Sequence, residues 1–553
     1  MTDFSQARQR YLDRKAALEA DNDFPQTFGE LLTRARDQHG SKPALDYFDQ
    51  GCAVNFEELY RQVYSLANGL HRLGIGKGSH VAVLLTNRIE FPISWLALGV
   101  LGAVMLPVNT RYTGAELDYL VNDGDAEFLL TESSLLPTFH AMEKRPAAMS
   151  DHRVIVVDPD PGGGHHDWHA IQRTGSADFT PHWKVLGDDL MNIQYTSGTT
   201  GFPKGCMQTQ RYWLLLGCFS GAFNPDVRAI LSDHPFFYMD PQWQLIQAIY
   251  AGACIYTPSK ISSSKFVERI HTYGIEMAFF PRPLISEPAR PEDRETPLKK
   301  LFALGMGATA QQRLSERFGV PIYEAFGMTE IGPGLIVPEE LVDDPNILGT
   351  CGVATPFREA KVAVDDQGTE AGVEEVGELW IRGDSILKGY YNKPEANAES
   401  FHEGWFKTGD LFIRDEHGYY RIVGRKKDMI RRSSENISAL EVEQALSAHP
   451  QIKQAAAVPV PDDYRGEEVK AYLLLREGET PTRISPEAVV EHCRSRLAAF
   501  KVPRFIAYVD EFPYTPSEKV AKHKLVARSD NLRANSWDAE QGGWLDSDGL
   551  PAS

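Results

Sequence analysis

One short polar stretch indicates the fold of this chain: "NIQYTSGTTGFPKG", residues 192–205. It holds three glycines, five hydroxyl side chains and a single lysine, Lys204. Glycine has no Cβ and tolerates positive φ, so backbone N–H groups in such a turn can converge on an anion. We therefore predict that the turn cradles a polyphosphate. The residues that would contact it besides Lys204 are Thr196, Ser197, Gly198, Thr199 and Thr200.

The turn differs from the P-loop of nucleotide triphosphatases. In the pattern G-x-x-x-x-G-K-[ST] the lysine directly follows the last glycine and opens a helix. Here Phe202 and Pro203 separate Gly201 from Lys204. This spacing argues against the kinase and P-loop interpretations. An ordinary surface loop is the alternative that we keep.

Length and composition narrow the class of protein. A chain of 553 residues is too long for a single core, so two or more domains are expected. The net charge of −19 argues against nucleic acid as the main partner, because no basic field exists to release counterions. The six cysteines form no C-x-x-C pair, which indicates neither a zinc site nor a disulfide framework and fits a reducing cytoplasm.

No segment is expected to cross or enter a membrane. The N-terminal stretch is charged throughout and lacks the apolar core of a secretory signal. The longest apolar run, "FPISWLALGVLGAVMLPVN" (residues 91–109), is interrupted by prolines and glycines. We interpret it as a buried helix followed by a buried strand.

Strand-like and helix-like segments alternate up to about residue 330. Residues 80–85, 104–109 and 126–132 have the apolar character of buried strands, and residues 90–103 and 113–124 between them have helical character. This alternation predicts βαβ units wound around a parallel sheet. β signals dominate afterwards, with a hairpin turn at residues 415–418.

The chain is expected to have three parts. We place an N-terminal domain at residues 1–426 and a compact α+β domain at residues 427–528. The last stretch, residues 529–553, is polar and acidic without periodicity, so we expect a disordered tail there.

Six stretches in a fixed order identify a family resemblance. They are "YTSGTTGFPKG", "YEAFGMTE", "GELWIRGDSILKGYYNKPE", "GWFKTGDLF", "GRKKDMIRRSSENISALEVE" and "FPYTPSEKV". Over nearly its whole length the chain resembles the adenylate-forming superfamily, which includes acyl-CoA synthetases, firefly luciferase and the adenylation domains of peptide synthetases. Within it, "SSENISALEVE" and "TPSEKV" are most similar to the crotonobetaine/carnitine:CoA ligases and their relatives.

The resemblance implies an α/β fold and a two-step reaction. The large N-terminal domain would contain wound α/β subdomains and a β-rich subdomain, and a small α+β lid would rotate about a hinge at Lys427. In the first step a carboxylate attacks the α-phosphate of Mg-ATP and forms an acyl-adenylate and pyrophosphate. In the second step a thiol, usually that of coenzyme A, displaces AMP.

The resemblance also assigns residues around the phosphates. Residues 196–204 would bind the β- and γ-phosphates, Glu330 would hold Mg²⁺, and Thr329 would donate to the α-phosphate. Lys519 would contact both the attacking carboxylate and the α-phosphate, because an ammonium there offsets the repulsion between two anions. Glu518 stands before it where relatives commonly have glycine.

The nucleoside would be held by four further residues. Gly307 and Ala308 belong to "GMGA", a loop that lies against the adenine in the family and closes the acyl pocket. Asp410 would accept from the ribose hydroxyls, and Arg425 would lie near the ribose and phosphates. Taken alone, Asp410 could be a turn aspartate and Arg425 a solvated charge.

The acyl pocket is expected to be too polar for a fatty tail. Arg282 would suit a second carboxylate through its planar fork, whereas Asp240 with aromatic neighbours would suit a quaternary ammonium. A structural Arg282–Asp240 pair, or two plain surface charges, is the alternative. We expect a compact acid with a second polar or charged group. The residues assigned to this pocket are Tyr238, Asp240, Trp243, Arg282, Met306 and Gly327.

Coenzyme A is the expected thiol, and a basic run in the lid would suit its phosphates. The residues assigned to it are Arg432, Ser433, Ser434 and Glu435. Ser434 replaces a glycine that borders the pantetheine tunnel in relatives, and its hydroxyl would narrow that tunnel. The alternatives are a solvated charged loop, loading of a carrier protein, a luciferase-like oxygenase and a nucleotide-binding pseudoenzyme. A homodimer is one assembly that we consider.

Overall fold

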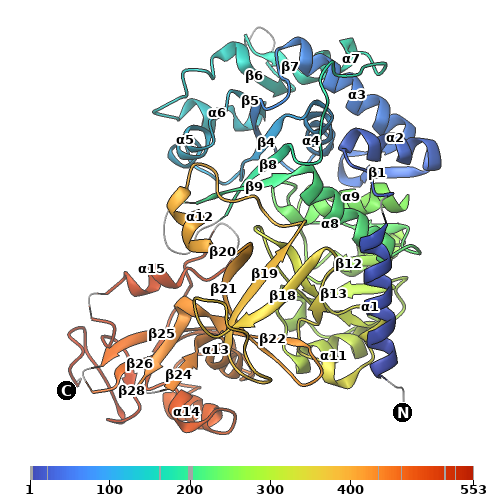
Figure 1. Cartoon of the computed structure of the whole chain (residues 1–553). Helices are drawn as coiled ribbons and strands as arrows, with labels where there is room; N and C mark the ends of the chain where they lie inside the picture. The colour runs from blue at the N-terminus through green and yellow to red at the C-terminus, as the bar shows by residue number, and fades with distance from the viewer. Residues whose placement is uncertain are drawn as a thin grey trace. The chain divides into compact units, whose positions relative to one another are not determined.

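The computed structural model describes residues 4–21, 23–160, 164–196, 203–433, 435–462, 464–515, 519–529 and 531–551. It divides into two compact units, whose elements are labelled in Figure 1. The first contains the described residues up to 196 together with residues 203–360 and 381–405, and the second contains residues 361–380 and those from 406 onward. The predicted α/β class, with a large N-terminal part and a smaller C-terminal one, is confirmed. The boundary at residue 427 and the hinge stay predictions.

A seven-stranded sheet of order β7-β6-β5-β3-β4-β8-β9 carries the polar stretch that opened the sequence. Strand β3 pairs in parallel with β4 and β5, and β5 pairs in parallel with β6, so the predicted βαβ winding is confirmed. The strands are β3 (His80–Leu84), β4 (Val104–Pro107), β5 (Phe128–Glu132), β6 (Val154–Val157), β7 (His166–Asp167), β8 (Leu190–Tyr195) and β9 (Gly205–Thr209).

A second seven-stranded sheet has the order β14-β13-β12-β10-β11-β1-β2. Its strands are parallel except for β2, which forms an antiparallel pair with β1. The strands are β1 (Pro43–Tyr47), β2 (Cys52–Asn55), β10 (Ala229–Leu231), β11 (Cys254–Tyr256), β12 (Met277–Phe279), β13 (Lys300–Phe302) and β14 (Ile322–Tyr323).

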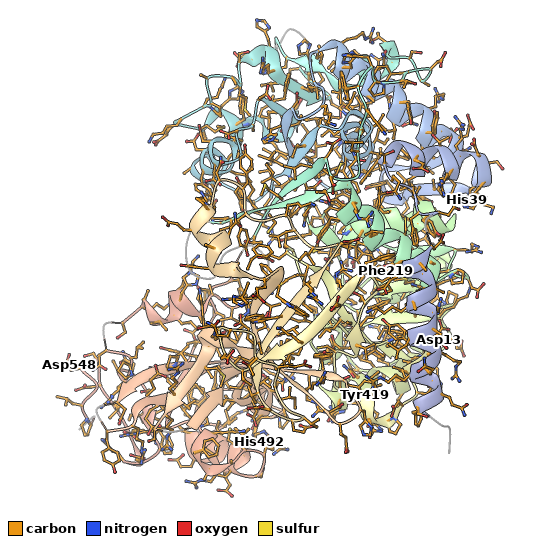
Figure 2. All side chains as sticks on the ribbon, viewed as in Figure 1. Asp13, His39, Phe219, Tyr419, His492 and Asp548 are labelled. Carbon is orange, nitrogen blue, oxygen red and sulfur yellow. The ribbon has the colours of Figure 1, made fainter. Side chains whose placement is uncertain are left out.

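Helices join these two sheets into one hydrophobic core. Apolar residues of β1, β3, β10 and β11 belong to the same buried cluster as helices α2, α3, α4, α8 and α9, and Figure 1 shows α8 and α9 beside both sheets. Phe219 of α8, labelled in Figure 2, is part of this cluster. The helices are α1 (Phe4–Ala20), α2 (Phe28–His39), α3 (Phe56–Arg72), α4 (Glu90–Leu101), α5 (Gly114–Asp123), α6 (Leu136–His140), α7 (Trp168–Thr174), α8 (Gln210–Phe223), α9 (Met239–Ala251), α10 (Phe266–Tyr273), α11 (Ala308–Phe318) and α12 (Pro394–Ser400).

The long apolar run forms a buried helix and a strand, as predicted. All twelve residues of α4 are buried, and Gly102 ends the helix in the left-handed conformation that glycine tolerates best. The chain then enters β4, which is also fully buried. None of the helices in the described ranges has the length and apolar character needed to span a membrane.

A small antiparallel sheet carries the "YEAFGMTE" motif. Strand β15 (Ala325–Met328) pairs with β16 (Gly332–Ile336), and β16 pairs with β17 (Val353–Ala354). The tight connection between β15 and β16 contains Thr329 and Glu330, and the Ile331 N–H donates to the Met328 carbonyl at 3.0 Å. The motif therefore lies in a turn with a defined backbone.

The second unit has its own core and sheet. Strand β21 (Trp405–Arg414) pairs with β22 (Tyr420–Arg425) in the predicted hairpin, whose turn is closed by the Asp415 carboxylate. A second sheet has the order β24-β23-β26-β27-β28-β29, with β25 on β26. Its strands and helices are β23 (Met429–Arg432), β24 (Glu435–Ser438), β25 (Ile452–Asp462), β26 (Gly466–Leu475), β27 (Phe505–Tyr508), β28 (Trp537–Asp538), β29 (Gly543–Trp544), α13 (Ala439–Ser447), α14 (Pro486–Arg494) and α15 (Lys522–Val526).

The prediction of a disordered tail at residues 529–553 is wrong for the residues described there. Strand β28 adds to the edge of β27, with Trp537 opposite Ile506, and β29 folds back on β28. Trp537 is buried in the core of the second unit, and Asp538 forms an ion pair with Arg504 at 3.0 Å. Trp537 and Leu545, which are both buried, supply apolar area that the low average hydrophobicity of the segment conceals.

We predict that Trp537 stabilises the second unit. Trp537→Ala would leave a large cavity in the core and should cost about 3–5 kcal/mol of stability. Trp544→Ala is the matched control, because the Trp544 side chain is 42% exposed and should matter little. Thermal unfolding followed by calorimetry measures both variants. Equal and small effects would mean that the segment does not pack in solution.

Candidate active site

The predicted phosphate-binding turn connects two antiparallel strands, β8 and β9. The Thr196 N–H donates to the Lys204 carbonyl at 3.0 Å and closes the base of the turn. The Lys204 ammonium lies 4.4 Å from the centre of the Tyr390 ring. Ser197, Gly198, Thr199 and Thr200 lie outside the described residues, so their phosphate contacts stay predictions.

Glu330 is buried, and a tyrosine hydroxyl orients its carboxylate. The Tyr390 O–H donates to Glu330 Oε1 at 2.9 Å, so Lys204, Tyr390 and Glu330 form one group. Burial and the neighbouring Glu330 raise the pKa of Tyr390, which therefore stays a neutral donor. Sequence reasoning missed Tyr390, although it lies in the quoted motif "GELWIRGDSILKGYYNKPE".

Backbone carbonyls around Glu330 are also held by buried groups. The Thr329 carbonyl accepts from Gln208 Nε2 at 2.7 Å and from the Tyr212 hydroxyl at 3.0 Å. The Glu330 carbonyl accepts from the Leu387 N–H at 2.7 Å. The predicted contact of Thr329 with the α-phosphate stays a prediction, but the position of its backbone is well defined.

The "GMGA" loop is held by a buried carboxylate that the sequence analysis did not identify. Glu324 accepts from the N–H groups of Gly305 at 2.7 Å and Met306 at 3.0 Å. Gln311 Nε2 contacts both the Met306 carbonyl and Glu324. Gly307 then caps α11, which begins at Ala308. Burial raises the pKa of Glu324 to about 7, and the backbone donors oppose this rise.

The predicted acyl-pocket residues of helix α9 lie in its first two turns and just before them. His234 Nδ1 lies at hydrogen-bond distance, 2.7 Å, from Asp240 Oδ2, and both side chains are partly exposed. Trp243 is buried against Phe279, with ring centres 6.0 Å apart. Tyr238 precedes the first residue of the helix. The side chain of Arg282 lies outside what the structure describes, so its proposed roles are untested.

Buried amides stiffen the wall behind these residues. Asn192 Nδ2 donates to Gln242 Oε1 at 2.7 Å, and its Oδ1 accepts from the Trp95 indole N–H at 2.8 Å. Gln194 Nε2 donates to the Phe237 carbonyl at 2.7 Å. Buried amides are costly unless they are hydrogen-bonded, so these contacts define the backbone of the wall. They were not anticipated, because the amides are far apart in sequence.

The remaining acyl-pocket residues, Met306 and Gly327, lie on neighbouring segments of the first unit. Met306 is buried in a cluster with β12 and β13 residues. Gly327 is in β15, where an added Cβ would lie 2.7 Å from the Gly332 carbonyl. That position therefore requires glycine for close strand packing.

The second unit contains the predicted ribose and adenylation residues. Asp410 is 3% exposed and lies opposite Arg425 in the β21–β22 hairpin, with Arg425 Nε 3.0 Å from Asp410 Oδ1. Burial raises the pKa of Asp410, and the positive charges of Arg425 and Lys519 oppose the rise. The predicted roles of Asp410, Arg425 and Lys519 toward the nucleotide stay predictions. The Lys519 side chain is exposed.

The predicted coenzyme A segment is basic, but several of its charges are paired. Arg432 Nε lies 2.7 Å from Glu468 Oε2, and Lys426 Nζ lies 3.1 Å from Glu378. The local positive field is therefore weaker than the sequence indicates. Ser433 has a positive φ of 57°, and its N–H donates to the Arg465 carbonyl. Ser434 and the side chain of Glu435 are outside the described part of the chain.

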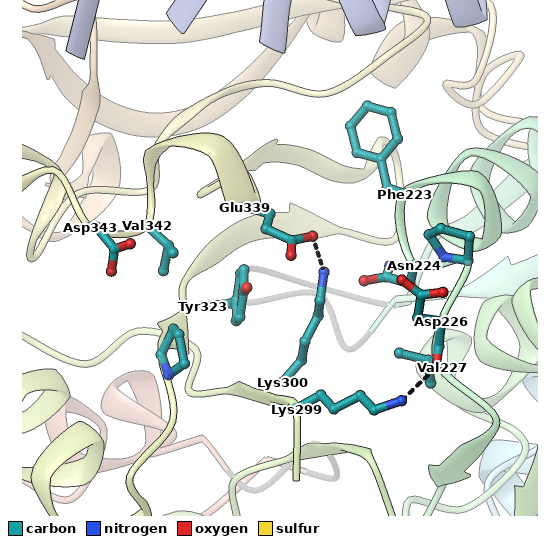
Figure 3. Close-up of a pocket in the computed structure, with 12 residues that line it drawn as sticks. Phe223, Asn224, Asp226, Val227, Lys299, Lys300, Tyr323, Glu339, Val342 and Asp343 are labelled. Atoms are coloured by element: carbon teal, nitrogen blue, oxygen red, sulfur yellow. Dashed lines mark hydrogen bonds and ion pairs between the residues drawn. The ribbon is translucent and has the colours of Figure 1, made fainter. Parts of the chain in front are cut away.

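The first unit also contains a cavity of about 390 Å³ (Figure 3). Lys300 Nζ reaches Glu339 at 2.7 Å across it, and Lys299 Nζ donates to the Asp226 carbonyl. None of the residues that line it was assigned to the site. Both of its ammonium groups are engaged by protein oxygens, so it does not replace the predicted acyl pocket.

The raised pKa of Glu324 predicts how stability depends on pH. Because the folded-state pKa of Glu324 lies above the usual value, the contribution of this group to stability should be complete below about pH 4.5, and up to about 3 kcal/mol of it should be lost as pH rises through 7. Denaturant unfolding at pH 5 and pH 8 should show a smaller loss for Glu324→Gln than for the wild type. Glu316→Gln, at an exposed position of α11, is the control. An unchanged pH dependence in Glu324→Gln would contradict the assignment.

Comparison with known proteins supports the family resemblance that the sequence motifs indicate. The family model "AMP-binding enzyme" matches residues 32–391, and "AMP-binding enzyme C-terminal domain" matches residues 441–519. The crotonobetaine/carnitine–CoA ligase of Salmonella paratyphi B is 32% identical over 510 residues, which are 88% of this chain and 96% of that protein.

Solved structures agree with the fold. ATP-bound MatB from Rhodopseudomonas palustris has a TM-score of 0.79 and 26% identity over 91% of this chain and 99% of its own. O-succinylbenzoate coenzyme A synthetase from Bacillus subtilis, in complex with ATP and a magnesium ion, has a TM-score of 0.75 and 25% identity over 90% and 99%. The chain therefore belongs to the AMP-binding enzyme family, and within it to the adenylate-forming acyl-CoA and aryl-CoA ligases.

Proposed function

We propose that the protein is an ATP-dependent carboxylic acid:CoA ligase that acts on a compact acid with a second polar or charged group. The acid's carboxylate oxygen would attack the α-phosphorus of ATP, and pyrophosphate would leave. The thiol of coenzyme A would then attack the acyl carbon, and AMP would leave. The observation that supports this most directly is the buried Asp410 carboxylate of the second unit, which is paired with Arg425 and in which the positive charge of Lys519 opposes the rise in pKa caused by burial.

Lys519 would act in the first step. Two anions, the acid's carboxylate and the α-phosphate, must approach each other, and an ammonium between them lowers the electrostatic cost. Asp410 would accept from the ribose hydroxyls, and its pairing with Arg425 fixes the carboxylate for that contact. The nucleoside and the reacting phosphate would therefore be positioned by neighbouring groups.

The donor set around Glu330 fits Mg²⁺. No group of three or more His, Cys, Asp or Glu side chains able to hold a metal occurs among the described residues. Mg²⁺ is typically bound by one or two carboxylates together with substrate phosphates and water, so one buried carboxylate beside a phosphate-binding turn suffices. When bound, the ion would neutralise charge on the phosphates. Glu330 would hold it, and Tyr390 would orient Glu330.

The acid would meet a polar entrance and an aromatic wall. The Asp240–His234 pair is only partly buried, which leaves both groups able to contact a second polar group on the acid. Trp243 and Phe279 form an aromatic surface beside it. We propose that Tyr238 and Arg282 complete the specificity pocket. The free thiols of all six cysteines support a proposed cytoplasmic location.

We expect Lys519→Ala to abolish adenylation selectively. Acid-dependent release of pyrophosphate should fall by about 10²-fold or more, because one preorganised electrostatic contact is lost. Thioester formation from chemically supplied acyl-adenylate and coenzyme A should persist. Lys524→Ala, an exposed lysine in α15, is the matched control and should behave as the wild type. Equal loss of both half-reactions would exclude the proposed role.

Selectivity among carboxylic acids tests the proposed polarity of the acyl pocket. Pyrophosphate release should be measured with carnitine, crotonobetaine, aromatic mono- and dicarboxylates, short acyl acids and palmitate. We expect kcat/KM for a compact polar acid to exceed that for palmitate by about tenfold or more, since buried unpaired polar groups disfavour an alkyl tail.

Two variants separate the candidate contacts. Asp240→Ala should weaken selectivity for a cationic acid, and Arg282→Ala should weaken selectivity for a dicarboxylate. Asp226→Ala, at the separate cavity, is the control. Preference for palmitate would contradict the proposed acid class, and unchanged selectivity in both variants would remove these residues from the pocket.

A further inference from the structure

A buried guanidinium lies next to the proposed magnesium carboxylate and has no carboxylate partner of its own. Arg358, the first residue of β18 (Arg358–Ala363), is 1% exposed. Within the described ranges, no Asp or Glu oxygen lies within ion-pair distance of it. Burying a cation without a counter-ion is costly, so such an arginine is retained only where its hydrogen bonds are well satisfied.

The guanidinium is satisfied by oxygens on two distant segments and on the residues just before Arg358. Its Nε donates to the Ile331 carbonyl at 2.8 Å. Its Nη2 donates to the Ser385 carbonyl at 2.7 Å and to Ser385 Oγ at 3.0 Å. Longer contacts at 3.3 Å join Nη1 to the Thr355 hydroxyl and the Pro356 carbonyl. The planar fork of arginine can hold both segments at once, which a lysine could not do.

The first segment is the turn that contains Glu330. The carbonyls of Thr329, Glu330 and Ile331 all accept hydrogen bonds from buried groups, and Arg358 supplies the last of these. Gly332 follows with φ of 61°, and a Cβ there would lie 3.0 Å from Arg358 Nη2. Any other residue at 332 would be strained at this φ and would crowd the guanidinium, so glycine suits this position.

The second segment runs from Ser385 to Tyr390, and the Tyr390 hydroxyl orients the Glu330 carboxylate. Ser385 Oγ donates to the Tyr212 carbonyl at 2.8 Å, which anchors the start of the segment. Two residues later the Leu387 N–H donates to the Glu330 carbonyl, and Tyr390 donates to the Glu330 carboxylate. Both the backbone and the side chain of Glu330 thus depend on a segment that Arg358 anchors.

We propose that Arg358 is a positioning residue for the magnesium-binding carboxylate: it holds the turn beside Glu330 and, through Ser385, the segment that presents Tyr390 to Glu330. The inference rests on the proposed role of Glu330. Groups that orient a metal ligand without touching the metal commonly change metal affinity by about 10–100-fold when they are removed.

Metal affinity tests this more directly than activity does. Mn²⁺ replaces Mg²⁺ at oxygen sites and can be followed by electron paramagnetic resonance. Each variant is titrated with Mn²⁺ in the presence of α,β-methylene-ATP, which cannot release pyrophosphate. Arg358→Met should raise the Mn²⁺ dissociation constant by about tenfold or more. Ser385→Ala, which removes one acceptor, should raise it by about threefold.

A matched control separates positioning from general destabilisation. Arg317 is another arginine of the first unit, with a side chain that is 9% exposed, and it pairs with the buried Asp293 at 2.6 Å. Arg317→Met should lower the melting temperature while leaving the Mn²⁺ dissociation constant within about twofold of the wild type. If Arg358→Met does not fold, Arg358→Lys and Ser385→Ala decide the question.

Glu330→Gln distinguishes failure of this inference from failure of the proposed role of Glu330. If Glu330→Gln leaves the Mn²⁺ dissociation constant unchanged, Glu330 does not hold the metal, and both ideas are wrong. If Glu330→Gln raises it while the folded Arg358 and Ser385 variants stay within about twofold of the wild type, only the positioning role is overturned. If the Mn²⁺ dissociation constant rises in Glu330→Gln and in the folded Arg358 and Ser385 variants, but not in Arg317→Met, the positioning role of Arg358 is supported.

Discussion

The candidate site depends on one constraint: three consecutive backbone carbonyls, at Thr329, Glu330 and Ile331, must be hydrogen-bonded away from water. Gln208 and Tyr212 satisfy the first, the Leu387 N–H the second and Arg358 the third. Because an unpaired buried carbonyl is costly, the turn has little freedom to rearrange. The position of the Glu330 carboxylate therefore follows from the packing of residues distant in sequence.

Hydrogen bonds of buried polar groups also fix the backbone in the walls of the site. Glu324 fixes the "GMGA" loop through two backbone N–H groups, and Gln311 supports the loop from α11. Asn192 and Gln242 join β8 to α9 behind the proposed acyl pocket. These polar groups contribute specific geometry, whereas the apolar cluster between the sheets contributes most of the stability.

In the second unit, one buried carboxylate connects the tail of the chain with the proposed coenzyme A segment. Glu468 is fully buried and pairs with Arg432 and Arg465, and Arg465 also pairs with Glu540 of the C-terminal stretch. Residues 531–551 are thus an integral part of this unit. Charge pairing also explains why a basic run in sequence does not produce an equally basic surface.

The sequence by itself determined the family, the βαβ winding, the buried helix α4 and the identity of the motif residues, because these depend on local periodicity and on short patterns of glycine, hydroxyl and charged side chains. The polar composition of the C-terminal segment led to a wrong prediction of disorder, because its Trp537 packs in the core of the second unit. Tertiary structure alone decided that Tyr390 meets Glu330, that His234 pairs with Asp240 and that Arg358 supports the turn. Such contacts join residues that no periodicity relates, since they arise only when separate strands and turns bury their polar groups together.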